Sequence, residues 1–507
     1  MHQTGRRSGS WSRKGMLAVA TTIAAALALS GCASSDNGGA SSSGTSAAQS
    51  SAAQASSAAP GSSAKPSSAA SSQATSGTTA SLTIATNGIS GGKNALEADW
   101  ITNYVIPEFT KQQAAKGVTV TATYQPSGVD DEQYKSKLAL DLKAGSGPDI
   151  MSIDGIWVGE FAQAGYIKPL SEVVGPSYEQ WDGWAQIKEP VQGNVSFQDE
   201  RYGVPAGTDG RVIFFNKKLF EQAGLPADWQ PKSWDDIAAA AEQLKSINGI
   251  TPLQLNGGSA MGEATTMQGV LPLLVGTGAT IYSDGKWLGN TPQLRSVLDF
   301  YNKVYNTDGL GDPQLQLDAK GRDESFAEFA DNKIGMLIES DYFWRSVVEP
   351  TKGVAPMADR DTAVGYALIP AQTAGSGVNG NDNVSMSGGS GFVLNPNTAN
   401  PELAWELLTF MASPEAIKAR LGTTAQITAR DDVNNEILAG DPMLSFVAKD
   451  VLPVTNYRPG LAEYTQVSAA LQQATADVVS GTSVEDAAAT YQTTVEGIVG
   501  AGNVSSG

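Results

Sequence analysis

The stretch YKSKLALDLKAGSGPDIMSI, residues 134–153, decides the fold. Its first half, residues 134–144, places apolar side chains at helical spacing and predicts an amphipathic helix. Residues 145–147 supply a glycine-rich turn, and residues 148–153, with Ile150, Met151 and Ile153, predict the next strand. A helix that leads through such a turn into a buried strand is one unit of an α/β sheet.

The residues before this stretch repeat the alternation. Residues 82–85 predict a short buried strand, residues 98–113 an amphipathic helix, and residues 118–124 an alternating strand. The folded part of the chain therefore begins as strand, helix, strand, helix. This order predicts an α/β fold with a mostly parallel sheet and helices on both of its faces.

The folded part is too long for a single core. Residues 81–507 exceed the roughly 250 to 300 residues at which one hydrophobic core stops growing, so we expect two lobes. Ser233, Asn400 and Ser413 each precede a helical pattern and are predicted N-caps. Residues 375–391, rich in Gly, Ser and Asn, are predicted to form a loop.

The amino-terminal segment has the parts of an export signal. Its basic residues are Arg6, Arg7, Arg13 and Lys14. A mainly apolar run without any charged residue, residues 16–29, follows them and leads into Leu29-Ser30-Gly31-Cys32. A membrane span needs about 20 apolar residues, so this run is too short to remain as an anchor. We predict a signal peptide at residues 1–31 that is removed after export.

Residues 32–80 separate the signal from the folded part. They are mainly Ser, Ala, Gly, Thr and Gln, with no aromatic residue, and only Asp36 and Lys65 are charged. Such a segment cannot bury enough apolar surface to fold. It is predicted to be a disordered tether.

The composition excludes several kinds of chemistry. The sole Cys is Cys32 and the sole His is His2, so the folded part has neither a thiol nor an imidazole. Ser-His-Asp triads, Cys nucleophiles and zinc sites with His or Cys ligands all need those side chains. Chemistry that uses two carboxylates, and simple binding, remain open.

The net charge argues against a nucleic-acid partner. The chain carries −19, which becomes about −23 once the four basic residues of the signal are removed. Phosphate backbones are held by clustered Lys and Arg, and no basic run occurs beyond the signal. We expect no nucleic-acid partner, and nothing in the sequence calls for a cofactor.

The order Leu29-Ser30-Gly31-Cys32 resembles the lipobox of bacterial lipoproteins. The resemblance implies that the Cys32 thiol receives a diacylglycerol and that Cys32 becomes the first residue of the mature protein. It also implies a lipid-anchored protein on the extracellular face of the cell membrane. The long tether favours a Gram-positive envelope.

Several groups of residues along the folded part together resemble one protein family. In chain order they are residues 134–138 with 144–150, 161–170, 202–205 with 214–217, 219–225, 233–236, 335–338, 404–411, 413–416 and 471–488. Their order and spacing resemble the extracellular solute-binding proteins of ABC importers, in particular the sugar-binding family that includes maltose-binding proteins.

The resemblance implies a type II binding-protein fold with two discontinuous α/β lobes. The implied boundaries are residues 81–207 plus 370–425 for lobe 1 and residues 208–369 plus 426–507 for lobe 2. Crossing strands are implied near residues 205–210 and 368–371, with the ligand between the lobes. Closure on the ligand would mark the loaded state for an ABC permease. The protein would be a monomeric carrier and not an enzyme.

Ligand contacts are expected where strands of the first lobe end. Asp154 and Trp157 follow the strand 148–153, so both should lie at the carboxyl edge of the sheet. Asp154 would accept sugar hydroxyls and Trp157 would stack on a sugar ring. The resemblance adds Asn87 and Gly88, directly after the first strand. The alternatives are a plain turn at Asn87 and Gly88, and packing beneath its own helix for Trp157.

The resemblance implies further contacts at the crossing and in the second lobe. Asp209 lies at the crossing, where the family commonly has an acidic contact, although a solvated turn is the alternative. Tyr342, Phe343 and Trp344 follow the strand 335–338, where the family has a stacking aromatic ring. Consecutive residues cannot all share one face, so Tyr342 and Trp344 are preferred over Phe343.

Two C-terminal segments complete the predicted site. Gly388, Gly389 and Ser390 precede a strand and would let backbone amides reach the ligand, or would serve only as a loop. Arg458 precedes a proline in a segment that resembles an Arg-Pro segment of the family. Its planar guanidinium would bind hydroxyls or form a structural salt bridge.

A neutral sugar or oligosaccharide is the ligand that the resemblance favours. Polyols, polyamines and glycerol phosphate are alternatives, because the family also includes their binders. A phosphate would need several basic side chains, and Arg211 with Arg458 is a small set. A polyamine would use Asp154, Asp209 and Tyr342. A cell-surface glycan-active enzyme with two carboxylates and a surface adhesin are the remaining hypotheses.

Overall fold

The computed structural model describes residues 79–129, 131–422 and 424–506. The predicted signal peptide, Cys32 and residues 32–78 of the predicted tether lie outside the described residues. Across the described ranges, no helix combines the length and the apolar character that crossing a membrane requires.

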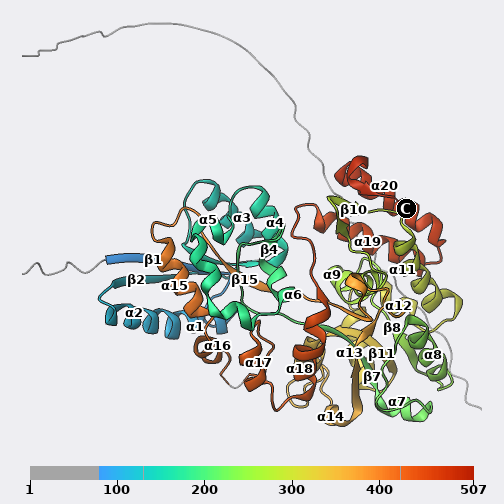
Figure 1. The fold of residues 1–507 in the computed structure, drawn as a ribbon. Coiled ribbons are helices and arrows are strands. Elements are labelled where there is room, and N and C mark those ends of the chain that lie inside the picture. The colour runs from blue at the N-terminus through green and yellow to red at the C-terminus, as the bar shows by residue number, and fades with distance from the viewer. Residues whose placement is uncertain (1–78, 130, 423, 507) are drawn as a thin grey trace, which may run out of the picture. The chain divides into compact units, whose positions relative to one another are not determined.

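A five-stranded sheet forms the centre of the first lobe (Figure 1). Its strands, in spatial order, are β2 (Thr119–Pro126), β1 (Thr79–Thr86), β3 (Ile150–Asp154), β15 (Ser390–Leu394) and β6 (Gly203–Pro205). β1 pairs in parallel with β2 and β3, whereas β15 runs antiparallel to both β3 and β6. β1 begins before the predicted start of the folded part: Ala80 is buried and pairs with Val120, so the last two residues of the predicted tether belong to the sheet.

A four-stranded sheet forms the centre of the second lobe. Its strands, in spatial order, are β12 (Val364–Ala367), β7 (Arg211–Asn216), β11 (Ile334–Ser340) and β8 (Thr251–Gln254). Only β8 and β11 pair in parallel, while β7 runs antiparallel to both of its neighbours. The prediction of a mostly parallel sheet is therefore wrong here and half right in the first lobe. Strands such as β7 and β15 enter their sheets directly from an interlobe crossing, so the strand-helix alternation does not set their direction.

Short strands complete the described fold. They are β4 (Ser196–Phe197) with β5 (Glu200–Arg201), β9 (Tyr282–Ser283) with β10 (Lys286–Leu288) and β17 (Val504–Ser505), and β13 (Ile369–Pro370) with β14 (Asn383–Met386) and β16 (Thr455–Asn456). β14 lies inside the segment predicted as a loop. The prediction missed β14 because glycines and serines surround this short strand and make the segment resemble a loop. Its last three residues, from Val384, are buried.

The described α-helices are, in chain order, α1 (Ala95–Trp100), α2 (Ile106–Ala115), α3 (Asp131–Lys143), α4 (Val158–Gln163), α5 (Leu170–Val173), α6 (Glu189–Gln192), α7 (Lys217–Gln222), α8 (Trp234–Leu244), α9 (Glu263–Thr265), α10 (Leu271–Gly276), α11 (Pro292–Asn302), α12 (Pro313–Leu317), α13 (Gly321–Ala330), α14 (Arg360–Ala363), α15 (Pro401–Met411), α16 (Pro414–Leu421), α17 (Asp431–Ile437), α18 (Pro442–Phe446), α19 (Tyr464–Val479) and α20 (Val484–Val499). Ser233 and Ser413 accept a hydrogen bond from the helix backbone as predicted, whereas the Asn400 side chain does not.

Both faces of the first sheet are covered by helices, as the sequence predicts. Ile150 packs on the side of α2 and α15, in one core cluster with Phe109 and Leu407. Its neighbour Met151 points to the opposite face and shares a cluster with Leu138 of α3. This alternation follows from the two-residue period of a strand. The carboxyl ends of β1 and β3 lie at one edge of this sheet, because the two strands run parallel.

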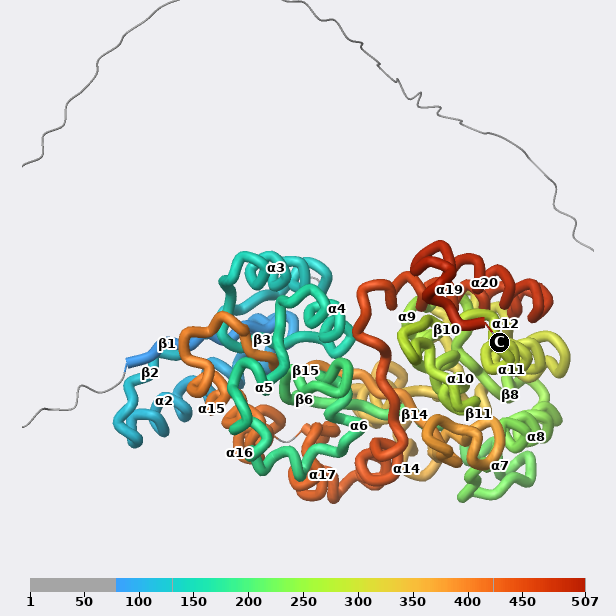
Figure 2. Tube along the Cα trace, turned by 45° about the horizontal axis from the view of Figure 1, so that its top comes forward, coloured from blue at the N-terminus to red at the C-terminus, as the bar shows by residue number. Residues whose placement is uncertain are grey.

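The chain passes between the two lobes more than once. Residues 206–210 lead from β6 to β7, and residues 387–389 lead from β14 back to β15. Figure 2 shows the segment that leads into α19 running along the junction of the lobes. These crossings bring residues far apart in sequence to one place.

Candidate ligand-binding cleft

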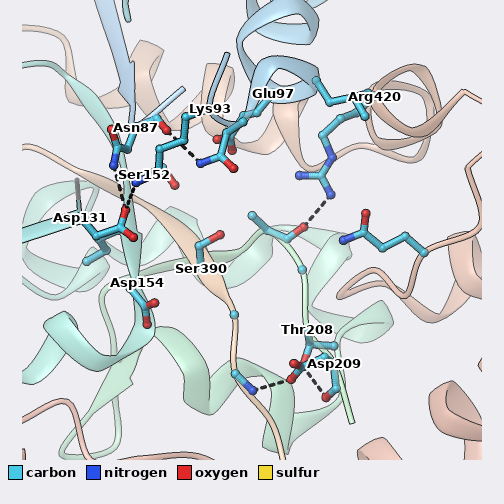
Figure 3. A pocket seen from close by; sticks show the side chains of 18 of the residues that line it. Asn87, Lys93, Glu97, Asp131, Ser152, Asp154, Thr208, Asp209, Ser390 and Arg420 are labelled. Carbon is cyan, nitrogen blue, oxygen red and sulfur yellow. Dashed lines mark hydrogen bonds and ion pairs between the residues drawn. The ribbon is translucent and has the colours of Figure 1, made fainter. Parts of the chain in front are cut away.

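A cavity of about 540 Å³ lies at the carboxyl ends of β1 and β3, beside the crossing residues 206–209 and 388–390 (Figure 3). Its polar and aromatic lining residues are Asn87, Lys93, Asn94, Glu97, Asp131, Tyr134, Ser152, Asp154, Trp157, Thr208, Asp209, Arg345, Ser390, Arg420 and Gln426. Ligands of α/β sheets bind outside the carboxyl ends of strands, so this cavity is the candidate binding cleft.

Asn87 begins the loop after β1 and takes part in a network at the rim of the cleft (Figure 3). The Asn87 amide and the Lys93 ammonium donate to the same oxygen of Asp131, at 2.8 and 2.7 Å. The hydrogen bond from Lys93 is the main reason that the pKa of Asp131 lies below its ordinary value. The Asn87 amide oxygen is buried and has no partner among the described residues, so it is an unsatisfied acceptor beside the cleft.

Asp154 is the last residue of β3. One of its carboxylate oxygens accepts the Ile156 N–H at 3.1 Å and caps the 3-10 turn Gly155–Trp157. The side chain is 41% exposed and lies 4.0 Å from the guanidinium of Arg458. Partial burial raises the pKa of the Asp154 carboxyl, and Arg458 opposes that shift. The carboxylate therefore has acceptor capacity that the described protein groups leave unused.

Two aromatic rings lie beneath the cleft. Tyr134 of α3 and Trp157 have their ring centroids 6.4 Å apart, and Trp157 also stacks against Phe161 at 6.5 Å. Trp157 thus both packs against its helix and lines the cleft. The Tyr134 hydroxyl is buried without a partner in the described ranges. Because burial raises the pKa of Tyr134, its hydroxyl stays protonated and can donate.

Asp209 holds the two crossings together. Its carboxylate accepts the backbone N–H of Gly388 at 2.7 Å and pairs with Arg211. The neighbouring Thr208 hydroxyl bonds to the Tyr457 hydroxyl at 2.7 Å. The Asp209 carboxylate therefore makes its hydrogen bonds within the protein, and the residue also lines the cleft.

The second crossing approaches the first closely at Gly389. Its φ of +147° is one that side chains rarely adopt, and a Cβ there would lie 2.4 Å from the backbone oxygen of Gly207. Glycine is therefore required at this position. The next residue, Ser390, pairs with Asp154 in the sheet, which sets both at the floor of the cleft.

Two arginines reach the cleft from distant parts of the chain. Arg420 of α16 donates to the backbone oxygen of Ala206 at 3.1 Å. It also opposes the rise in pKa that burial causes in Glu97. Arg345 donates to the buried carboxylate of Asp341 at 2.9 Å. Within the described ranges, no group of three or more acidic, His or Cys side chains is arranged to hold a metal ion.

The cleft brings together six of the ten predicted ligand-binding residues: Asn87, Asp154, Trp157, Asp209, Gly389 and Ser390. Gly88, Tyr342, Trp344 and Arg458 are not among its lining residues. The Gly88 oxygen accepts the Tyr124 hydroxyl at 2.8 Å and the Ser127 N–H at 3.0 Å. Gly88 therefore lies in a turn, which was the alternative to a ligand contact.

The three aromatic residues after β11 separate because the chain becomes helical there. Phe343–Val347 form a π-helical turn, so Tyr342 and Trp344 do not share a face as they would in a strand. Phe343 is fully buried, as expected. Trp344 lines a separate cavity of about 360 Å³ and donates to Asp441 at 3.0 Å. Tyr342 lies half-buried beside the guanidinium of Arg345.

Sequence reasoning missed the remaining polar lining residues, among them Lys93, Asp131, Thr208 and Arg420. Asp131 could have been found, since it follows the second predicted strand as Asp154 follows the third. Thr208 adjoins a predicted contact. Arg420 carries no such signal, because it meets the crossing at Ala206 from 214 residues away in sequence.

Comparison with known proteins supplies the family. Residues 94–418 match the model of the bacterial extracellular solute-binding proteins. The chain belongs to this family. The solute-binding protein is 26% identical over 277 residues to a Brucella abortus (strain 2308) protein named only as a binding protein, which covers 54% of the chain and 61% of that relative. The matched part thus spans about three fifths of the relative's length.

Other relatives carry more specific names. The solute-binding protein is 23% identical over 257 residues to the mannitol-binding protein of Pseudomonas aeruginosa, covering 49% of the chain and 54% of that protein. It is 23% identical over 289 residues to the diacetylchitobiose binding protein DasA of Streptomyces coelicolor, covering 55% of this chain and 60% of that protein.

Solved structures agree with the two-lobe fold. A solute-binding protein from Thermotoga lettingae bound with α-D-tagatose is 26% identical, with a TM-score of 0.56 over 82% of this chain and 99% of that chain. The sugar-binding protein MalE of Xanthomonas citri has a TM-score of 0.65 at 18% identity, over 82% of this chain and 97% of that chain. At this identity the likeness supports the fold alone. The family and these neighbours are binding proteins.

Proposed function

We propose that this solute-binding protein captures a neutral sugar or oligosaccharide in the cleft and delivers it to an ABC permease. The observation that carries the proposal is the state of the charged side chains in the cleft. Each has a counter-charge or a backbone partner within the protein, while uncharged groups such as the Asn87 amide oxygen and the Tyr134 hydroxyl have none among the described residues. A ligand that offers hydroxyls and no net charge complements such a surface.

The basic side chains of the cleft leave little for an anion. Lys93 is paired with Asp131 at 2.7 Å and Arg345 with Asp341 at 2.9 Å. Arg420 donates to a backbone oxygen. A phosphate would have to break these pairs, and the energy of a new ion pair would be offset by the loss of an old one.

The acidic side chains leave little for a polyamine. Asp131 is bound by Lys93, and Asp209 is bound by Arg211 and a backbone N–H. Asp154 keeps unused acceptor capacity, and a carboxylate serves sugar hydroxyls as well as it serves an amine. The names of relatives that bind tagatose, mannitol and diacetylchitobiose support the same class of ligand.

The class of ligand can be tested by thermal denaturation of the purified protein. Neutral mono- and oligosaccharides, mannitol, sn-glycerol 3-phosphate and spermidine are added one at a time. We expect a saccharide at tens of micromolar to raise the melting temperature, because a ligand that binds only the folded state stabilises it. A rise with glycerol phosphate or spermidine alone would reject a neutral ligand. Release of new reducing ends during long incubation would favour the glycan-active enzyme.

Replacing Tyr134 with Phe is expected to weaken sugar binding by about 5- to 10-fold, because one neutral hydrogen bond contributes roughly 1 kcal/mol. The free energy of unfolding should stay unchanged or rise slightly, since the hydroxyl has no partner among the described residues. Calorimetric titration and thermal denaturation give the two quantities.

Tyr491→Phe is the matched control. The Tyr491 hydroxyl is equally buried and also without a described partner, but it lies in α20 outside the cleft. Its removal should leave sugar affinity unchanged. An affinity loss as large as that of Tyr134→Phe would contradict a contact between Tyr134 and the sugar.

The proposed delivery step includes a lipid anchor at Cys32. A carrier that returns to one permease benefits from attachment to the same membrane. Cys32→Ala in the full chain should move the protein from the membrane fraction to the culture medium with sugar affinity unchanged. Fractionation with immunoblotting measures this. Continued retention at the membrane would contradict the anchor.

A further inference from the structure

The segment between β16 and α19 contacts both lobes. At its start, β16 pairs with β14. Further on, the backbone oxygen of Gly460 accepts the Glu160 N–H of α4 at 2.5 Å. A Cβ on Gly159 would lie 2.5 Å from that Gly460 oxygen, so the two backbones are in close contact. The segment then enters α19 in the second lobe (Figure 2).

Arg458 is the charged residue of this segment. Its side chain is only 12% exposed. One guanidinium nitrogen lies 3.1 Å from Glu263 of α9, and the other lies 4.0 Å from Asp154 at the floor of the cleft. A single rigid guanidinium thus stands between a carboxylate of the first lobe and a carboxylate of α9.

The two ends of this bridge differ in how firmly they are held. Glu263 also accepts hydrogen bonds from the Tyr464 hydroxyl and, at 2.7 Å, from the Ser468 hydroxyl. At the other end, 4.0 Å is too long for a direct hydrogen bond between Arg458 and Asp154. Asp154 can therefore accept a hydrogen bond from a ligand while Arg458 still attracts its negative charge.

We infer that Arg458 is a positioning residue: fixed by its ion pair with Glu263, it places a positive charge 4.0 Å from Asp154 and so favours the carboxylate that accepts a ligand hydroxyl. The inference rests on the proposed function only in taking the ligand to be a sugar. The coupling among the three side chains is independent of it. Arg458 acts through Asp154, so it need not touch the ligand that the cleft receives.

The charges around Asp154 show why such a partner is needed. Burial is the main cause that raises the pKa of Asp154, with smaller contributions from the like charges of Asp131 and Asp209, while Arg458 is the cation that lowers it. Without Arg458 the pKa of Asp154 should rise further. A protonated Asp154 accepts fewer and weaker hydrogen bonds than a carboxylate.

The test compares Arg458→Met with Arg458→Lys by thermal denaturation between pH 4 and pH 7.5, with no ligand present. At neutral pH we expect Arg458→Met to melt roughly 1–3 °C below the wild type, because Asp154 is then charged without its cation. As the pH falls through the pKa of Asp154 the carboxyl becomes neutral, so the difference should shrink. Arg458→Lys, which keeps the charge, should recover most of it.

Two further variants separate this role from plain packing. Adding Asp154→Asn to Arg458→Met should restore part of the neutral-pH melting temperature, since Asp154 then carries no unpaired charge, while Glu263 keeps its hydrogen bonds from Tyr464 and Ser468. Arg360→Met is the matched control, because Arg360 is 13% exposed and lies outside the cleft. Its difference from wild type should not respond to Asp154→Asn, because the carboxylate that Arg360 pairs with is Asp361. A pH-independent loss in Arg458→Met, without rescue by Lys, would overturn the inference.

Sugar affinity gives a second readout once the panel has named a binding saccharide. Arg458→Met should weaken that saccharide about 10-fold at pH 7, with the loss of affinity on acidification beginning at higher pH than in the wild type. If no saccharide binds, the proposed function fails while the ligand-free melting test still decides the role of Arg458.

Discussion

Replacing Asp154 with Asn is expected to weaken sugar binding about 30-fold at pH 7. A hydrogen bond to a charged group contributes roughly 1.5–3 kcal/mol, and 2 kcal/mol corresponds to about 30-fold in the dissociation constant. Asn keeps the shape of the side chain and an oxygen that can cap the Ile156 N–H, so the fold should be retained. Calorimetric titration of the wild type and the variant measures the effect.

The pH dependence of the same titration sharpens this prediction. Since the pKa of Asp154 is raised, the accepting carboxylate is present above that pKa and is lost as the pH falls through it. Wild-type affinity should therefore fall on acidification, while that of Asp154→Asn should change less. Asp182→Asn, an exposed change outside the cleft, should stay within two-fold of the wild type. An Asp154→Asn variant that binds as well as this control would contradict the role of Asp154.

Arg322→Met is expected to lower the free energy of unfolding by about 3–5 kcal/mol, the usual cost of leaving one partner of a buried ion pair alone. The Glu339 carboxylate, 2% exposed, accepts two hydrogen bonds of 2.7 Å from Arg322. It also accepts from Asn256 at 3.3 Å. Met keeps the apolar stem while removing the charge. Urea denaturation followed by tryptophan fluorescence measures the loss.

Two variants control for this result. Lys333→Met breaks an exposed pair with Asp331, in which the two side chains are 53% and 66% exposed, and should cost less than about 1 kcal/mol. Adding Glu339→Met to Arg322→Met should recover part of the loss, because the unpaired charge is gone. The account of Glu339 would be wrong if Arg322→Met cost no more than Lys333→Met.

The elements that carry the first lobe could be predicted because their patterns are local. The helix and strand of residues 134–153 appear as α3 and β3, and the strand at residues 82–85 lies within β1. Where a strand ends follows from the same patterns, and this is why Asn87 and Asp154 both lie at the cleft. Strand direction in the second lobe is not local, since β7 is set by the crossing from the other lobe.

The rest of the site depends on tertiary structure. Arg345 follows a strand, but the helical turn that begins at Phe343 decides which side chains face the cleft. The sequence offers no sign of that turn, so the expected ring of Trp344 points to another cavity. Arg458 was equally open to a hydroxyl contact and a salt bridge. Its two carboxylate neighbours come from opposite lobes and are visible only in the folded chain.

A calorimetric comparison of one saccharide with its own charged derivatives tests the central claim most directly. The saccharide that most raises the melting temperature is titrated into the purified protein beside its phosphorylated and aminated forms. Because the basic side chains of the cleft already have partners and Arg458 already neutralises the charge of Asp154, we predict one-site micromolar binding of the neutral form, about −8 kcal/mol, and at least 10-fold weaker binding of both derivatives. A derivative that binds as tightly as the neutral saccharide, or more tightly, would contradict a neutral-sugar cleft.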